Sequence, residues 1–189
     1  MNLILITVIG ISTQSCKKGE NDPFLSFRSR DGRLTRSWSL SSIDQTTTTT
    51  VSSGGPSVTS KTTVTYSGKV KTTQKDKDPA DEDQFTLELT FDKRGIVTYR
   101  YESFDDDGKS TGVFEGAGSW AWNDTDKRKS GLSLSFEEEA IDNEVGGDWD
   151  VDQLKKKELI LKHSYQKKMN NKDNSVETSM ESTYTFTEN

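Results

Sequence analysis

Residues 85–91 read FTLELTF, and apolar and polar side chains alternate in this stretch without a break. Successive side chains of a β-strand point to opposite faces, so Phe85, Leu87, Leu89 and Phe91 share one face. An alternation this strict is typical of a strand with one side in a core and the other in water. The stretch therefore predicts a half-buried β-strand, and its period of two is the pattern to look for elsewhere.

The same period recurs along most of the chain, in stretches separated by turn-forming residues such as those at 92–95 and 105–109. Apolar or aromatic side chains alternate in 38–40, 58–70, 97–101, 114–122, 132–136, 159–165 and 176–186. Together with 85–91 this gives about eight strands with short connections, which favour antiparallel neighbours. The low-complexity segment 46–53 is predicted to be a threonine-rich strand end that leads into a loop.

A meander of this length leaves unpaired backbone groups at its two edges unless the sheet closes on itself. We therefore predict an all-β fold, an antiparallel up-and-down barrel of about eight strands, with a β-sandwich as the alternative. Asp22 and Pro23 predict the start of a short N-terminal helix that ends near Gly32. The barrel domain is expected to span residues 34–189.

The composition favours a folded domain and argues against several classes of function. The chain has eight Phe, five Tyr and four Trp, more aromatic residues than disordered chains carry. Its net charge of −6 argues against nucleic acid as a partner, because phosphate contacts need clustered basic residues. The sequence contains no Gly-x-Ser-x-Gly elbow and no phosphate-binding glycine loop, so we expect no enzyme activity and no cofactor.

Two groups of residues invite a metal-site interpretation. Asp148, Asp150 and Asp152 have the spacing of the first EF-hand ligands, but the glycine and glutamate that complete such a loop are missing. On a strand, these three side chains would simply face the solvent. His163 is the only histidine, and we expect a half-buried packing residue rather than a metal ligand.

The first sixteen residues carry a localisation signal. Residues 3–11 form an apolar run that is too short to cross a membrane as a helix, which takes about 20 residues. Small and polar residues follow at 12–15, as at the cleavage point of a secretory signal peptide, and then comes Cys16, the only cysteine. This arrangement resembles the lipobox of bacterial lipoproteins, whose cysteine becomes the lipidated first residue of the mature protein.

The lipobox resemblance implies a signal peptide at 1–15, lipidation at Cys16 and a lipidated tether with the short helix at 16–33. We expect an exported protein that is anchored by lipid in the bacterial cell envelope. The expected membrane is the outer one, on its periplasmic or surface face.

The segment LTRSWSL at 34–40 and the run from Trp149 to Leu161 resemble two regions of lipocalin-like domains, the entry to the barrel and the penultimate strand. Over about residues 22–188 the chain is similar to the lipocalin-like lipoproteins of the Bacteroidota. The resemblance implies that Trp38 closes one end of the barrel. It also implies that the barrel binds a small hydrophobic or amphipathic ligand.

An eight-stranded barrel is just wide enough to be filled by side chains or to hold one small ligand. Small residues on the predicted inner faces favour a cavity; these are Ser60, Thr62, Gly68, Gly116, Gly118, Thr178 and Ser182. Tyr99, Tyr101, Trp120 and Trp122 are the candidates for a ligand-binding wall, with plain core packing as the alternative for each. The competing function is a structural or protein-interaction module of the envelope with a filled barrel and no ligand.

Overall fold

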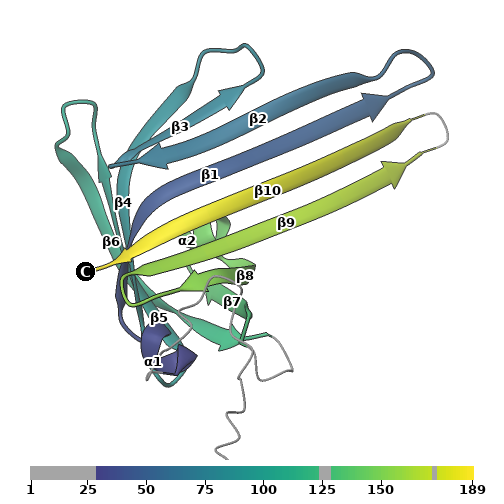
Figure 1. Ribbon diagram of the computed structural model, residues 1–189. Helices are drawn as coiled ribbons and strands as arrows, with labels where there is room; N and C mark the ends of the chain where they lie inside the picture. Colours follow the sequence, from purple (N-terminus) through teal and green to yellow (C-terminus); the bar gives the residue numbers. More distant parts are fainter. Residues whose placement is uncertain (1–28, 124–128, 172–173) are drawn as a thin grey trace, which may run out of the picture.

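The computed structural model describes residues 29–123, 129–171 and 174–189, which form ten strands and two short helices (Figure 1). The elements are α1 (Arg30–Leu34), β1 (Ser37–Ser52), β2 (Val58–Ser67), β3 (Val70–Lys75), β4 (Asp81–Phe91), β5 (Ile96–Phe104), β6 (Ser110–Trp122), β7 (Gly131–Phe136), α2 (Glu139–Val145), β8 (Gly147–Leu154), β9 (Glu158–Asn170) and β10 (Ser175–Glu188). Each strand pairs antiparallel with the next one, and β10 pairs with β1 to close the barrel. The predicted up-and-down barrel is confirmed, and closure excludes the β-sandwich.

The predicted count of about eight strands is wrong, because the sequence pattern predicts neither β3 nor β8 as a separate strand. Residues 58–70 contain the turn between β2 and β3, where Gly68 has a φ of +72° that glycine adopts without strain. The run from Trp149 to Leu161 is not one penultimate strand. It contains the end of β8, at Leu154, and the beginning of β9, at Glu158.

The barrel has two circumferences. At its narrow end Ser37–Ser39 of β1 pair with Glu88–Thr90 of β4, so the ring there consists of β1 and β4 to β10. Farther along, β2 and β3 lie between β1 and β4 and widen the ring. The backbone N–H of Phe85 donates to the carbonyl of Lys69 at 2.8 Å and joins the β2–β3 turn to β4.

The core fills the narrow part of the barrel with the alternate residues that the sequence predicts. Phe85, Leu87, Leu89 and Phe91 of β4 are each at most 2% exposed, whereas the residues between them are half-buried. The other walls contribute Val97, Tyr99, Trp120, Leu132, Leu134, Phe136, Trp149, Val151, Leu159, Leu161, Tyr184 and Phe186. Burial of these side chains is the main force that stabilises the barrel, at roughly 25 cal/mol per Å² of apolar surface.

A helix covers each end of the core. At the narrow end the Ser29 hydroxyl accepts a hydrogen bond from Gly32 N at 3.1 Å and caps α1. Gly32 lies inside α1, so the helix end predicted there is wrong, and the start predicted at Asp22 lies outside the described residues. At the wide end α2 buries Ile141 and Val145. Within the described ranges, no helix is long and apolar enough to cross a membrane.

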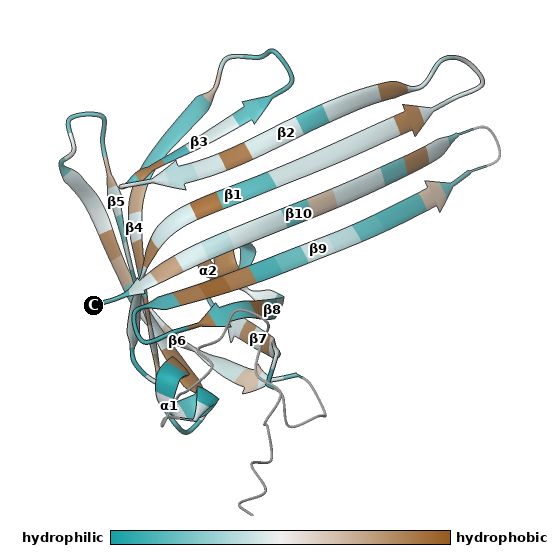
Figure 2. Cartoon of the chain, viewed as in Figure 1, coloured by the Kyte–Doolittle hydropathy of each residue, from teal (hydrophilic) through white to brown (hydrophobic). Residues whose placement is uncertain are grey.

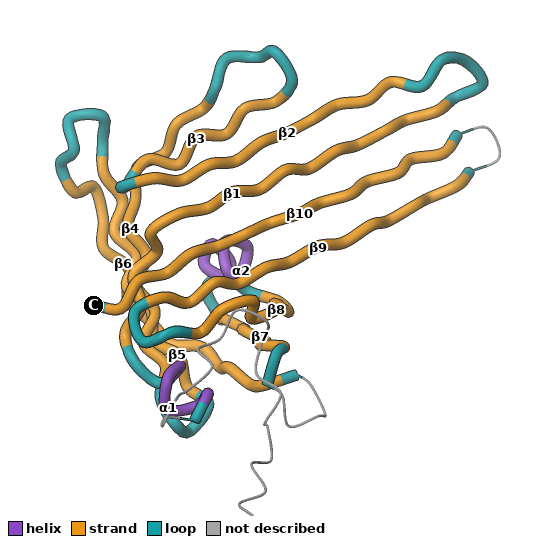
Figure 3. Tube along the Cα trace, in the orientation of Figure 1, coloured by secondary structure: helices purple, strands orange, loops and turns teal. Residues whose placement is uncertain are grey.

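Four strands continue past the core as a long sheet, which we call the arm (Figures 1 and 3). The arm comprises residues 45–52 of β1, 58–64 of β2, 163–170 of β9 and 175–182 of β10, in the order β2-β1-β10-β9. At about 3.3 Å per residue its length is about 25 Å. The threonine-rich strand end predicted at 46–53 is confirmed, since β1 runs to Ser52.

Candidate functional site

The four residues predicted to form a ligand-binding wall lie at different levels of the barrel. Trp120 and Trp122 lie near the narrow end, where Trp122 Nε1 donates to Asp31 Oδ1 of α1 at 2.7 Å. Tyr99 and Tyr101 lie farther along β5. Tyr99 and Trp120 belong to the buried core, and Tyr101 and Trp122 are partly buried against it. The structure therefore does not bring the four together around one open space, and their role in ligand binding stays a prediction.

The glycines of β6 do not leave room inside the barrel. A Cβ at Gly116 would come within 2.5 Å of the Tyr99 hydroxyl, and one at Gly118 would come within 2.7 Å of the Phe136 ring. Tyr99 and Phe136 also meet edge to face, with ring centres 5.7 Å apart. Larger aromatic neighbours occupy the space that these glycines provide.

Four other small residues that were expected to create a cavity belong to the arm. Ser60, Thr62 and Thr178 are residues of the arm, where the strands have passed beyond the buried part of the barrel. Ser182 lies at the base of the arm and donates to Gln45 Oε1 at 3.1 Å. Small side chains here shape the arm and not an internal cavity.

Trp38 lies at the narrow end and is fully buried. Its Nε1 donates to the carbonyl of Leu34 in α1 at 2.9 Å. The guanidinium of Arg36 lies 5.9 Å from the Trp38 ring centre, and it forms an ion pair with Glu188 of β10. Trp38 is thus packed where the helix, the first strand and the last strand meet.

The wide end holds a polar cluster that the sequence analysis does not identify. Glu144 of α2 forms an ion pair with Lys71 of β3, and the Tyr184 hydroxyl of β10 donates to Glu144 at 3.5 Å. Burial raises the pKa of Tyr184, and burial together with the charge of Glu144 and the neighbouring Tyr101 raises the pKa of Tyr66 to about 12. The cluster fastens α2 to two walls of the barrel.

We expect the protein to lose stability above pH 10 because of Tyr66 and Tyr184. An unfolded tyrosine ionises near pH 10, whereas Tyr66 holds its proton to about 12. The stabilisation from Tyr66 is present below pH 10 and is lost as the pH rises from 10 to 12, by roughly 1.4 kcal/mol per pH unit. The raised pKa of Tyr184 adds a loss in the same direction above pH 10. Urea unfolding between pH 8 and 12 measures this slope. Tyr66→Phe should reduce the slope and leave the contribution of Tyr184, and an unchanged slope would contradict the assignment.

A small pocket lies between α2 and the β5–β6 wall. Its volume is about 130 Å³, and it is lined by Tyr101, Phe114, Glu138, Ala140, Ile141 and Glu144. Sites for drug-sized ligands usually measure about 300–1,000 Å³. The pocket therefore has room for a small apolar group, and Tyr101 is the one predicted wall residue that lines it.

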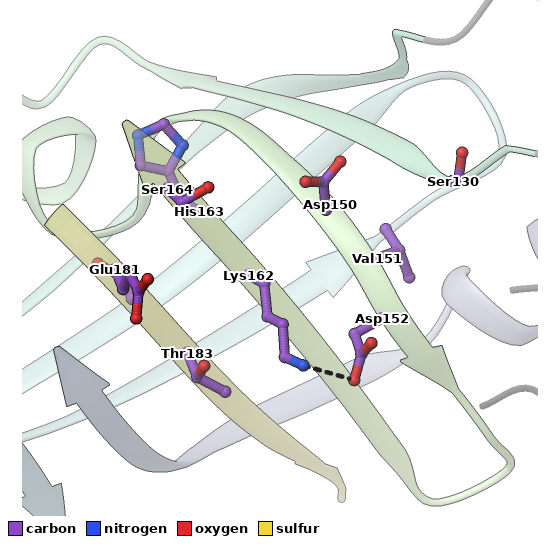
Figure 4. A pocket seen from close by; sticks show the side chains of 10 residues that line it. Ser130, Asp150, Val151, Asp152, Lys162, His163, Ser164, Glu181 and Thr183 are labelled. Atoms are coloured by element: carbon purple, nitrogen blue, oxygen red, sulfur yellow. Dashed lines mark ion pairs between the residues drawn. The ribbon is translucent and has the colours of Figure 1, made fainter. Parts of the chain in front are cut away.

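A broad hollow of about 580 Å³ lies on the polar outer side of β8, β9 and β10 (Figure 4). Asp150 lines it, and Asp152 forms an ion pair with Lys162 at 3.2 Å. His163 is half-buried, and its Nδ1 lies 2.8 Å from the carbonyl oxygen of Asp148. Within the described residues no group of three acidic, histidine or cysteine side chains is placed to hold a metal ion.

The arm has two chemically different faces. Its inner face continues the side of the sheet that carries Ile43, Tyr66, Leu161 and Tyr184 in the core. The inner face consists of Gln45, Thr47, Thr49, Val51, Val58, Ser60, Thr62, Val64, His163, Tyr165, Lys167, Met169, Val176, Thr178, Met180 and Ser182. It contains no acidic residue, although the chain has 31 Asp and Glu.

Exposed apolar side chains gather on this inner face. Seven large apolar side chains of the described residues are at least 38% exposed, and four of them are Val51, Val58, Tyr165 and Met169. Val58, Val51, Val176 and Met169 pair in one row across all four strands near the tip. Figure 2 shows this return of hydrophobic residues at the far end of an otherwise polar sheet.

Comparison with known proteins does not place the chain in a family. No family model matches the sequence. No curated protein matches it either. Among solved structures the chain is similar to Ail, the attachment invasion locus protein of Yersinia pestis, solved with the heparin analogue sucrose octasulfate. The identity is 10%, the match covers 80% of this chain and 99% of Ail, and the TM-score of 0.20 is too low to transfer any property.

Proposed function

We propose that this protein is an exported, lipid-anchored interaction module in which a filled barrel presents the arm to a protein partner. The distribution of exposed apolar side chains is the observation that supports this function. The buried side chains of the barrel pack into one core cluster, whereas Val51, Val58, Tyr165 and Met169 are exposed together on the inner face of the arm. Contiguous exposed apolar surface on a soluble domain marks an interaction site.

Cross-linking in the intact cells that produce the protein tests the role of the arm. A photoreactive amino acid at Val58 or Met169 should give an adduct with the same partner protein. The same amino acid at Lys93, in the exposed β4–β5 turn, is the matched control and should not give it. An adduct that forms equally at all three positions, or at none, would contradict a partner site on the arm.

The lipid anchor proposed at Cys16 lies outside the described residues and rests on the lipobox resemblance. We expect mass spectrometry of the N-terminal peptide to show acyl chains on Cys16, and we expect Cys16→Ala to block that modification. Two or more acyl chains are needed for stable anchoring, at roughly 0.8 kcal/mol for each buried methylene. A wild-type protein without acyl mass would overturn the anchor but not the role of the arm.

A second candidate function, binding of a small amphipathic molecule, is favoured by the pocket beside α2. The rings of Tyr101 and Phe114 and the side chain of Ile141 give it an apolar wall, and Glu144 lies at its side. Native mass spectrometry of the purified protein should then show a bound molecule that is lost in Phe114→Ser. Because Phe114 is 54% exposed, this change should leave the fold intact. A bare mass for the wild type would favour the interaction module.

A further inference from the structure

The outer part of β9 is an unpaired edge of the arm. β9 pairs with β10 from Glu158 to Asn170, but its pairing with β8 ends at Lys162. At the next residue the His163 ring, and not its backbone, meets the carbonyl of Asp148. Within the described residues, Ser164–Asn170 have no strand on their second side, and all seven are exposed.

An unpaired edge offers a row of backbone N–H and C=O groups to another chain, and natural proteins usually shorten or protect such strands. This edge is seven residues long and contains no proline. Strand addition to an edge of this kind is an established way of binding an extended peptide: backbone hydrogen bonds supply affinity and alternate side chains supply specificity.

The side chains of this edge favour an acidic partner. Lys167 points to the inner face and Lys168 to the outer face, and no acidic residue lies between Ser164 and Asn170. Lys167 stands opposite Thr178 of β10, so the inner face supplies no carboxylate beside it, whereas Lys168 stands opposite Glu177 on the outer face. Tyr165 and Met169 flank Lys167 on that same face and are 41% and 54% exposed.

We propose that Ser164–Asn170 of β9 binds an acidic, extended segment of another protein, which adds to the arm as a further strand. This inference rests on the proposed function and names the chemistry of the partner. Apolar side chains on the inner face of the added strand contact Tyr165 and Met169. Acidic side chains at the middle of that strand lie beside Lys167 and Lys168.

The same lysines disfavour a second copy of this chain as the added strand. When two β9 edges pair antiparallel around their centres, Lys167 lies opposite either Lys167 or Lys168 of the other copy. Like charges directly opposite each other destabilise a pair of strands. Lysine on an edge is also a common protection against edge-to-edge association.

Binding of synthetic peptides to the detergent-solubilised full chain tests the proposal. The probes are octapeptides of alternating valine and serine in which the two central residues are both glutamate, both lysine or both serine, so that one of the two faces each side of the sheet. Their binding is compared by fluorescence anisotropy at low salt. We expect the glutamate peptide to bind at least tenfold more tightly than the other two. We also expect hydrogen exchange to slow at Ser164–Asn170 when that peptide is bound, because the added strand protects the backbone amides.

A charge reversal supplies the matched comparison. Lys167→Glu with Lys168→Glu should weaken binding of the glutamate peptide at least tenfold and should strengthen binding of the lysine peptide. Lys155→Glu with Lys156→Glu makes the same change in net charge at the exposed turn before β9, and it should alter either affinity less than twofold. Circular dichroism checks that both variants remain folded.

Several outcomes would overturn the acidic-strand proposal. These are equal binding of the three peptides, binding without protection of Ser164–Asn170, and a dimer in sedimentation whose own contact protects that segment. Cross-linking through Val58 and Met169 distinguishes a failure of the proposed strand addition to β9 from a failure of the proposed function of the arm. Loss of peptide binding with retained cross-links rejects the edge and keeps the arm as partner site, whereas loss of both rejects the proposed function.

Discussion

Trp38→Ala is expected to lower the free energy of unfolding by about 3–5 kcal/mol, the usual cost of removing a large aromatic side chain from a packed core. Trp38 is fully buried, and its Nε1 donates to the carbonyl of Leu34, so the substitution leaves a cavity and removes one of the two hydrogen bonds that this carbonyl accepts. The loss should be measured by urea unfolding followed by circular dichroism. The midpoint urea concentration should fall without a change in slope.

Two further variants separate the contributions at this position. Trp38→Phe keeps an aromatic ring and loses the hydrogen bond to Leu34, so it should cost less than Trp38→Ala. Val58→Ala removes an apolar side chain that is 69% exposed, and its effect should stay within about 0.5 kcal/mol. If Trp38→Ala costs no more than Val58→Ala, Trp38 does not hold the narrow end together.

The walls of the barrel are predictable from sequence because each core strand has one face toward the solvent and one face toward the core. The alternation in 85–91 is such a signal, and every apolar residue in it is buried. β3 gives no such signal, because it is mostly Lys, Thr and Gln and has no buried face. α2 escapes prediction for another reason: its seven residues span too few turns to establish a helical period.

The arm shows what a period of two in the sequence can and cannot predict. The pattern correctly assigns Thr178 and Ser182 to the same face, but it does not tell where the opposite wall of the barrel stops. That depends on strand length: β1 has 16 residues and β10 has 14, whereas β7 has 6. Residues that were expected to line a cavity are therefore on a sheet that projects past the core.

The aromatic candidates illustrate a second limit. Alternation places Tyr99, Tyr101, Trp120 and Trp122 on inner or core-facing positions, yet it says nothing of what each ring meets. Trp120 Nε1 donates to the carbonyl of Asp92 at 2.9 Å. Contacts of this kind depend on the closure of the barrel and on the position of α1 and α2, which no local pattern in the sequence determines.

The separation of core and arm has an energetic consequence. Most of the buried apolar surface lies below the arm, so substitutions on the arm should change binding much more than stability. Substitutions between neighbouring strands of the barrel should instead change stability, above all where short strands pair over few residues. We call such a strand-to-strand contact a seam. β6 and β7 pair over five residues, from Gly118 with Phe136 to Trp122 with Leu132, and this seam is a sensitive place for a substitution.

Gly118→Ala is expected to destabilise the protein by about 2–3 kcal/mol, in the upper range for an overpacked core. A Cβ at this position would lie 2.3 Å from the carbonyl oxygen of Ser135 and 2.7 Å from the Phe136 ring. A flexible side chain end can move aside, but Ser135 presents backbone that is held in β7. The substitution must therefore push β6 away from β7 and weaken the seam.

Gly55→Ala is the matched control, because its nearest neighbour would be Ser53 at 3.7 Å in the exposed loop at the arm tip. It should unfold at the same urea concentration as the wild type. Hydrogen exchange should locate the damage in Gly118→Ala, with faster exchange in β6 and β7 than in β1 and β10. A Gly118→Ala protein that matches Gly55→Ala in stability would contradict the close approach of β6 to Ser135.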